Sequence, residues 1–327
     1  MILAGDIGGT KTNLALFEVK EGKLSLFKQA QFASREFSSL RDVIIAFEAK
    51  IAMTEVSAAC FGIAGPVIDG RCRTTNLPWD ISTEDLQKHL GTEKVRLMND
   101  LEATAYGMLY LPEEEFVNLN PTGCAVEGNR AVIAAGTGLG EAMLYHDSKQ
   151  YHPIGSEGGH CDFAPVTTQQ DALLKWMRNR YPEHVSFERI LSGPGIYTLY
   201  EFLRDSGFAP EPTSMLKIEE GEDKSAMVSE CALKEHDPLC METLHLFAEI
   251  YGAEAGNLAL KTMSLGGVYI GGGIAPKILP ILTNQHFMNG FVSKGRFEEM
   301  LRGMQVKISL NAETALLGAA HFAVDRL

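Results

Sequence analysis

The chain has 327 residues, 45% hydrophobic and 22% charged, which is typical of a folded enzyme with room for two domains. Its net charge of −13 argues against nucleic acid or an anionic membrane surface as a partner, and no apolar run is long enough to span a membrane. The six cysteines form no Cys-x-x-Cys pair, which predicts reduced thiols and a cytoplasmic location.

The first part of the chain alternates strand and helix patterns. Apolar runs predict strands at 2–5, 14–19, 25–32, 58–63 and 95–98, and amphipathic patterns predict helices at 40–52, 82–90 and 101–109. Ser82 is expected to cap its helix, with Asp85 three residues later in a capping-box position. The polar, proline-containing segment after 110 predicts a domain boundary near residue 112.

A second alternation begins beyond this boundary. Strands are predicted at 131–135, 141–145 and 266–270, with a mostly helical stretch at 165–263 between them and a helix at 313–324. The order strand, glycine turn, strand occurs at the head of each half, which predicts a duplicated α/β fold with a ligand in the cleft between halves. The expected domains are a small one, 1–112, completed by the helix at about 312–327, and a large one, 113–311, with helical insertions.

Two glycine-rich turns carry the first functional signal. They are Asp6-Ile7-Gly8-Gly9-Thr10 and Gly136-Thr137-Gly138-Leu139-Gly140, each between two strand-like runs. Main-chain N–H groups in such a turn can hold phosphate oxygens, although an ordinary tight hairpin would also use glycine. The chain has no P-loop sequence, and the strand pattern after Thr10 does not fit a dinucleotide fingerprint.

Asn99-Asp100 lies between these turns in the sequence and follows a short strand. Asp100 could be only a helix N-cap. As a carboxylate at the carboxyl end of a strand, it could instead accept the proton of an acceptor hydroxyl, while Asn99 holds neighbouring hydroxyls. Together with two phosphate-binding turns, this arrangement favours a phosphotransferase.

Other polar segments could complete a site. Glu157 and His160 flank two glycines and could face one small polar ligand, or they could be solvated loop residues. Zinc is not expected, because no cysteine cluster follows His160 and Cys161. Asn76 could contact a sugar, and Gly271-Gly272-Gly273 could form either a close βα turn or a surface for a purine. By periodicity, Glu188 is an ordinary residue on a helix surface.

These motifs together resemble the bacterial glucokinase family, in the superfamily of sugar kinases, heat-shock ATPases and actin. The resemblance covers nearly the whole chain. Its most specific segments are Glu157-Gly-Gly-His-Cys-Asp-Phe-Ala-Pro165 and Glu188-Arg-Ile-Leu-Ser-Gly-Pro-Gly195. Leu97-Met-Asn-Asp100, Gly266–Ile274 and Lys294-Gly-Arg-Phe297 are also similar to that family. The three closely spaced cysteines of the related repressor and kinase family are missing here, so His160 should face sugar.

The resemblance implies a duplicated ribonuclease H-like, actin-like ATPase fold with two domains and a central cleft. It implies that ATP and Mg²⁺ are used, with Asp6 orienting the ion through water. Asp100 would be the base, and the glucose ligands would be Asn76, Asn99, Asp100, Glu157, His160 and Glu188. The nucleotide would contact Gly5, Asp6, Ile7, Gly8, Gly9, Thr10, Gly136, Thr137, Gly138, Gly272 and Gly273.

The expected activity is therefore ATP-dependent phosphorylation of glucose at its 6-hydroxyl, by a protein that forms a homodimer as such families often do. Two alternatives stay open at this stage. One is a kinase for another hexose, such as fructose, mannose or an N-acetylated amino sugar. The other is a non-catalytic sugar-sensing regulator, which would need a DNA-binding extension.

Overall fold

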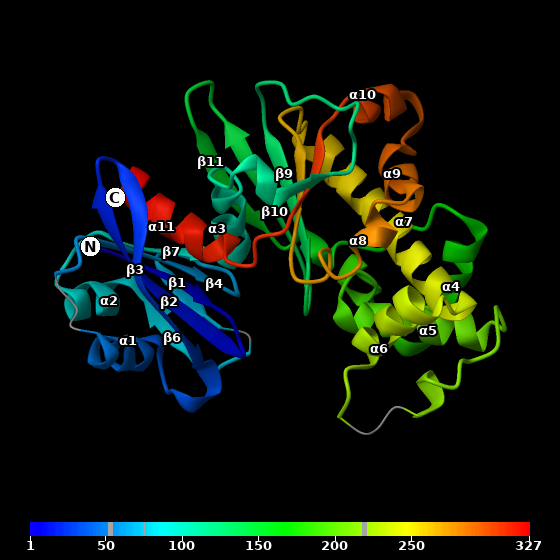
Figure 1. The fold of residues 1–327 in the computed structure, drawn as a ribbon, viewed down its shortest axis with the longest axis horizontal. Helices are drawn as coiled ribbons and strands as arrows, with labels where there is room; N and C mark the ends of the chain where they lie inside the picture. The colour runs from blue at the N-terminus through cyan, green and yellow to red at the C-terminus, as the bar shows by residue number, and fades with distance from the viewer. Residues whose placement is uncertain (52–54, 75, 218–220) are drawn as a thin grey trace. The chain divides into compact units, whose positions relative to one another are not determined.

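A computed structural model describes residues 1–51, 55–74, 76–217 and 221–327, and the chain forms two compact units (Figure 1). Unit 1 comprises Met1–Glu115, Ala142–Gly155 and Asn311–Leu327, and unit 2 comprises Phe116–Glu141 and Ser156–Leu310. The domain boundaries expected at 112 and 311, and the cleft expected between the domains, stay predictions.

Unit 1 is built on a five-stranded sheet of order β3-β2-β1-β4-β7. The first three strands are antiparallel neighbours, whereas β1, β4 and β7 run parallel. The strands are β1 (Ile2–Ile7), β2 (Lys11–Lys20), β3 (Lys23–Ala33), β4 (Ala58–Ile63) and β7 (Val95–Asn99), and a separate hairpin joins β5 (Arg71–Arg73) to β6 (Asp80–Ser82).

Helices cover both faces of this sheet. Leu3 on β1 belongs to a core that includes α1 (Leu40–Lys50) and Leu86 of α2 (Thr83–Leu90). Its neighbours along the strand, Ile2 and Ala4, instead join a core with α11 (Thr314–Arg326). This alternation is the two-residue period of a strand that is buried on both sides.

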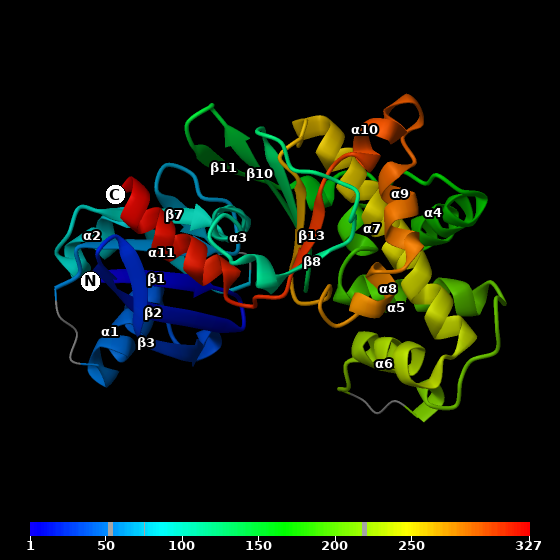
Figure 2. The ribbon, with the colours of Figure 1, turned by 45° about the horizontal axis from the view of Figure 1, so that its top comes forward.

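The C-terminal helix α11 packs directly against α3 (Asp100–Gly107), as both ribbon views show (Figures 1 and 2). The approach is close enough that a Cβ atom on Gly318 would lie 1.8 Å from the carbonyl oxygen of Ala103. Only glycine fits at position 318. The close packing of α11 fixes the position of α3, whose first turn contains Asp100.

Unit 2 contributes to a six-stranded sheet of order β11-β10-β9-β12-β13-β8. The order β11-β10-β9-β12-β13 repeats that of β3-β2-β1-β4-β7, and β12 is parallel to both β9 and β13. The strands are β8 (Phe116–Asn118), β9 (Arg130–Ala135), β10 (Leu139–His146), β11 (Tyr151–Ser156), β12 (Val268–Gly271) and β13 (Val306–Ser309). This repetition confirms the duplicated ribonuclease H-like fold.

The helical insertions of unit 2 gather around one long buried helix, α7 (Pro238–Thr262). Most α7 residues are buried, including Leu244, Phe247 and Tyr251. The other helices are α4 (Thr168–Arg180), α5 (Gly193–Asp205), α6 (Lys224–Glu230), α8 (Leu279–Leu282), α9 (Gln285–Val292) and α10 (Glu298–Arg302).

Some local predictions differ from the structure. Ser82 does precede α2, but its side chain makes no capping hydrogen bond, so the capping box expected with Asp85 is wrong. The predicted helix at 101–109 begins one residue earlier and ends at Gly107. Residue 52 of the first predicted helix, Thr75 of the loop around Asn76, and residues 218–220 of the polar segment 205–224 lie outside the described residues.

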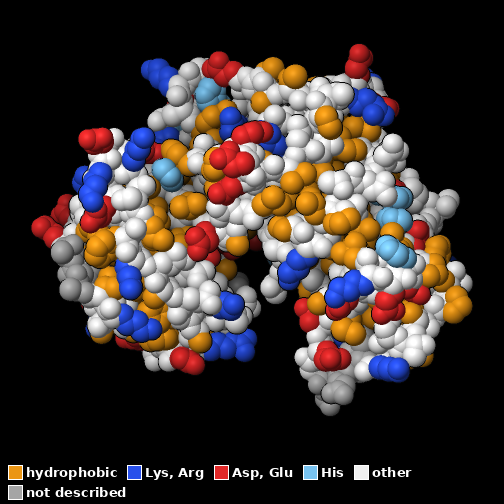
Figure 3. All heavy atoms as spheres, in the orientation of Figure 1, with side chains coloured by type: hydrophobic (Ala, Val, Ile, Leu, Met, Phe, Trp, Pro, Cys, Tyr) orange, Lys and Arg blue, Asp and Glu red, His pale blue; other side chains and the backbone are white. Residues whose placement is uncertain are grey.

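The described residues contain no helix that is both long and apolar enough to cross a membrane. In Figure 3, the Lys and Arg side chains of the visible face lie interspersed with Asp and Glu.

Candidate active site

The first glycine turn, at residues 8–10, connects β1 to β2 within unit 1. The Gly8 N–H donates to the Lys11 carbonyl at 2.9 Å and closes the turn. Ser34 holds it from outside: its hydroxyl donates to the Gly8 carbonyl at 2.8 Å, and its N–H donates to the Thr10 carbonyl at 3.0 Å. These bonds fix the carbonyls, so the turn is pre-organised to present N–H groups to an anion.

Asp6 precedes this turn on β1 and is largely removed from solvent. Burial raises the pKa of Asp6, opposed by the Asn13 amide, which donates to its Oδ2 at 3.3 Å. Gln31 in turn donates to Asn13 Oδ1 at 2.8 Å and orients that amide. A nearby cation would stabilise the charged form of a desolvated carboxylate held in this way, so the surroundings of Asp6 fit the role expected for it near Mg²⁺.

Asn99 and Asp100 lie where β7 ends and α3 begins. Asn99 is the N-cap: its Oδ1 accepts from Leu101 N at 2.9 Å, and its own N–H donates to Glu102 Oε2 at 2.9 Å. The interpretation of Asp100 as the cap is therefore wrong, because the cap is its neighbour. Asp100 begins the first turn of α3, where Leu101 N also donates to its Oδ1 at 2.9 Å.

Strand register brings the turn and Asp100 to the same edge of the unit 1 sheet. Asp6 pairs with Gly62 on β4, and Gly62 pairs with Met98 on β7. With adjacent strands about 4.8 Å apart, the Asp6 and Met98 backbones are separated by roughly 10 Å. The carboxyl ends of parallel strands are where α/β proteins place their ligands.

Asn76 lies against the first glycine turn. A Cβ atom on Gly9 would be only 2.7 Å from Asn76 Cβ, so the absence of a side chain at Gly9 is what admits Asn76. One small pocket is lined by Gly8, Gly9, Ala64 and Asn76, among others. The sugar contact expected of Asn76 stays a prediction.

The second glycine turn, at residues 136–138, joins β9 to β10. Gly136 N–H donates to the Gly138 carbonyl at 2.8 Å, and the Gly193 N–H donates to the Gly136 carbonyl at 2.8 Å. The strand end before it is held by Tyr251 of α7, whose hydroxyl accepts from Ala135 N at 3.1 Å. The long buried helix thus anchors this turn.

Glu188 occupies a 3₁₀ turn, Phe187–Arg189, and its carboxylate lies on the second glycine turn. Its Oε2 accepts from Leu139 N at 3.0 Å, and a Cβ on Gly138 would lie 2.4 Å from that oxygen. The interpretation of Glu188 as an ordinary residue on a helix surface is therefore wrong. Periodicity could not reveal a contact between positions 49 residues apart.

His160 ends a short 3₁₀ turn, Gly158–His160, beside Glu188. Its Nε2 lies 4.0 Å from Glu188 Oε1, and the two side chains are 58% and 31% exposed. A polar group and a carboxylate at this distance, both open to solvent, can bind adjacent hydroxyls of one ligand. Glu157 begins the same loop and is exposed.

Beneath this loop lies a buried carboxyl group that sequence reasoning missed. Glu141 is 1% exposed, its Oε1 has no hydrogen-bond partner, and a Cβ on Gly158 would lie 2.1 Å from its Oε2. Burial, with a further contribution from Glu254, raises the pKa of Glu141 to about 8. The only sequence signal was an acidic residue at an inward position just inside β10.

The glycines after β12 form a close turn against β9. Gly272 has φ +83°, and a Cβ there would lie 2.3 Å from the Ala135 carbonyl oxygen, so the position requires glycine on both counts. A Cβ atom on Gly273 would have no heavy atom within 4 Å, so the space above this residue is open. The purine surface expected here stays a prediction.

Two sheets that share one strand order, each with a glycine turn after its central strand, define the actin-like ATPase fold. The sequence profile described as Glucokinase matches residues 3–326. This chain belongs to the glucokinase family.

Individual relatives agree with the profile. The chain is 40% identical to a glucokinase of Nostoc punctiforme, with 98% of each chain covered, and 40% identical to one of Synechocystis sp., with 97% of this chain and 96% of that one covered. A crystal structure of glucokinase from an Antarctic psychrotroph has a TM-score of 0.83 at 31% identity and covers 98% of this chain and 97% of that one. A Streptomyces griseus glucokinase solved with glucose and AMPPNP, at 20% identity and a TM-score of 0.66, shares the fold.

Proposed function

We propose that Asp100 is the general base with which this glucokinase transfers the terminal phosphoryl group of ATP to the 6-hydroxyl of glucose. The observation that carries the assignment is its place: the carboxyl edge of the unit 1 sheet, the edge that also ends in the first glycine turn. The Leu101 N–H orients its carboxylate, and the start of α3 favours a negative charge there.

Asp100 would accept the proton of the 6-hydroxyl as its oxygen bonds to phosphorus and the bond to ADP breaks. Asn99, Asn76, Glu157, His160 and Glu188 would hold the remaining sugar hydroxyls. Glu188 is supported most directly, because Leu139 N and the adjacent His160 hold its carboxylate at a half-buried position that solvent still reaches. Positioning of this kind supplies much of the rate of phosphoryl transfer.

The phosphates would lie against the glycine turns formed by residues 5–10 and 136–138, and the adenosine on Gly272 and Gly273. When bound, Mg²⁺ would neutralise part of the phosphate charge, and Asp6 would hold it through water. Asn13 keeps Asp6 oriented for that role.

A substrate panel with a coupled ADP assay tests the activity, and Asp100→Asn tests the base. We expect glucose to be phosphorylated faster than fructose, mannose or an N-acetylated amino sugar. The variant should lose about 10²–10⁴-fold in kcat while glucose still binds by calorimetry. Asp171→Asn, at an exposed position on α4, is the matched control. An Asp100→Asn enzyme with normal turnover would refute the assignment.

The proposal extends to a homodimer that works in the cytoplasm, where it would carry out the first step of glucose use in glycolysis. The free cysteines support a reducing compartment. A regulator that binds DNA without catalysis is the competing function, and a specific gel shift with no ADP release would favour it.

A further inference from the structure

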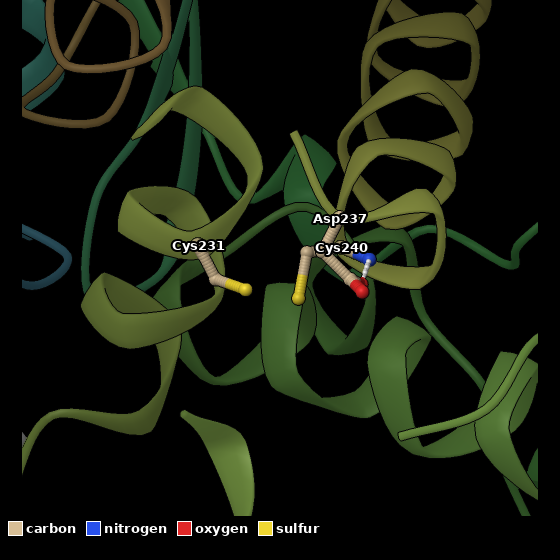
Figure 4. Close-up of side chains that lie close together, drawn as sticks. All are labelled: Cys231, Asp237 and Cys240. Carbon is tan, nitrogen blue, oxygen red and sulfur yellow. Dashed lines mark hydrogen bonds between the residues drawn. The ribbon is translucent and has the colours of Figure 1, made fainter. Parts of the chain in front are cut away.

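Two cysteines that are far from any recognisable motif meet in unit 2. Cys231 follows α6, and Cys240 lies in the first turn of α7, with eight residues between them in the sequence. Their sulfur atoms and a carboxylate oxygen of Asp237 all lie within 4.8 Å of one another. Figure 4 shows the two thiol groups turned toward each other beside the Asp237 carboxylate.

The two thiols of this cluster are buried. Cys231 and Cys240 are 2% and 0% exposed. A second carboxylate lies next to Cys231, because Glu235 Oε2 is 3.5 Å from its Sγ, and Ser214 Oγ is 3.0 Å from that same oxygen. Two buried thiols thus lie beside two carboxyl groups, of which Asp237 is half-buried and Glu235 is exposed.

The backbone around the cluster is irregular. Residues Cys231–Glu235 form a π-helical turn, and His236 adopts the left-handed conformation with φ 54°. Such departures from regular helix geometry often accompany sites that bind something. Here they place Cys231 opposite the first turn of α7.

We propose that Cys231, Cys240 and Asp237 form a binding site for a thiophilic divalent cation, with zinc as the best match and Glu235 as the fourth ligand. Two thiolates and one or two carboxylates suit Zn²⁺ better than Mg²⁺ or Ca²⁺, which prefer oxygen. The site is separate from the residues assigned to sugar and nucleotide, and it does not depend on the proposed catalytic roles.

The geometry needs only a small contraction. Zinc–sulfur bonds of about 2.3 Å in a tetrahedral site place two sulfurs roughly 3.8 Å apart, so the two sulfur atoms, which lie within 4.8 Å, must close by about 1 Å or less. The metal ligand is the thiolate, so binding should release protons from the two thiols.

Asp237 has a second role that sharpens the test. Its Oδ1 caps α7 by accepting from Leu239 N at 2.9 Å and from Cys240 N at 3.0 Å. Asparagine caps a helix about as well as aspartate. Asp237→Asn therefore keeps the fold of this turn and removes one of the two carboxylate ligands.

The experiment titrates the chelator-treated, reduced protein with Co²⁺, followed by displacement with Zn²⁺. We expect one equivalent to bind with a sulfur-to-cobalt charge-transfer band. The band should vanish in Cys231→Ser and Cys240→Ser, and affinity should fall tenfold or more in Asp237→Asn. Cys161→Ser and Cys124→Ser, at exposed cysteines, are the matched controls and should bind as the parent does.

Circular dichroism and the coupled kinase assay establish that each variant is folded, and Cys240→Ala replaces Cys240→Ser if the serine does not fold. Three results would overturn the proposal: no charge-transfer band in the parent, a band of undiminished intensity in Cys231→Ser or Cys240→Ser, or undiminished affinity in Asp237→Asn.

Discussion

Replacing Glu141 with glutamine tests whether this buried carboxyl group is protonated in the folded protein. Its pKa is raised to about 8 by burial and by Glu254, whereas an unfolded glutamate ionises near 4.5. Between these values the folded protein holds one more proton than the unfolded chain. The contribution of Glu141 to the stability of the folded protein is therefore fully present below about pH 4.5, and it is lost as the pH rises toward 8.

The size of the effect follows from how steeply the free energy of unfolding changes with pH. One extra proton in the folded state costs about 1.4 kcal/mol of stability per pH unit. Between pH 5.5 and 7.5, we expect Glu141→Gln to gain about 2–3 kcal/mol relative to the parent. Burial lowers the pKa of His245 and His321, which gives the opposite pH dependence, but both proteins share those groups and the comparison removes them. Glu254 interacts with Glu141 and its own pKa is raised by burial, so its titration is part of the measured difference.

Urea unfolding followed by tryptophan fluorescence measures the difference within unit 2. The chain has two tryptophans, and in a Trp79→Phe background the signal comes from Trp176, which packs on the unit 2 core. Glu183→Gln, at an exposed position, is the matched control and should follow the parent at every pH. A Glu141→Gln curve parallel to the parent from pH 5.5 to 7.5 would refute the buried proton, whatever the constant offset between them.

Three further substitutions test other parts of the structure. Glu102→Ala removes the acceptor for Asn99 N at 2.9 Å and for Gly155 N at 3.2 Å. The free energy of unfolding in urea should fall by about 1–2 kcal/mol, and an unchanged midpoint would contradict the capping role. Gly318→Ala forces α11 away from α3 and should cost about 3 kcal/mol by the same measurement, whereas a loss below about 1 kcal/mol would mean that the helices separate easily. Glu188→Gln keeps an acceptor for Leu139 N but loses the charge, so KM for glucose should rise about 10–100-fold with a smaller change in kcat; an unaltered KM would remove Glu188 from the sugar site.

The strands and their turns were predictable because their signals are local. The run before Asp6 and the run before Gly136 are continuous and apolar, as expected for strands buried on both faces, and glycine follows each at the point where the chain must turn. The repeated strand order follows from the same two segments heading similar series of elements. The family resemblance added the fold class, which spacing alone did not determine.

The N-cap of α3 shows where local reasoning stops short. The sequence Asn99-Asp100-Leu101-Glu102 contains two residues that cap helices equally well, and the glutamate three positions after Asn99 was the signal that selects between them. That signal was present in the sequence. Recognising it would have left Asp100 without a capping role and strengthened its assignment to chemistry.

The side chains that approach one another across long sequence separations could not be predicted from spacing, and the reason is geometric. Glu188 reaches Leu139 N because two loops, near 161–163 and 185–187, are joined by main-chain hydrogen bonds of 2.8 and 3.0 Å. Cys231 reaches Cys240 because a π-helical turn and a left-handed His236 reverse the chain between them. Each contact depends on a few backbone angles in an irregular segment, where a one-residue change in the turn would point the side chain elsewhere. Residue type alone therefore identifies candidates in such segments, whereas the backbone decides which of them share a site.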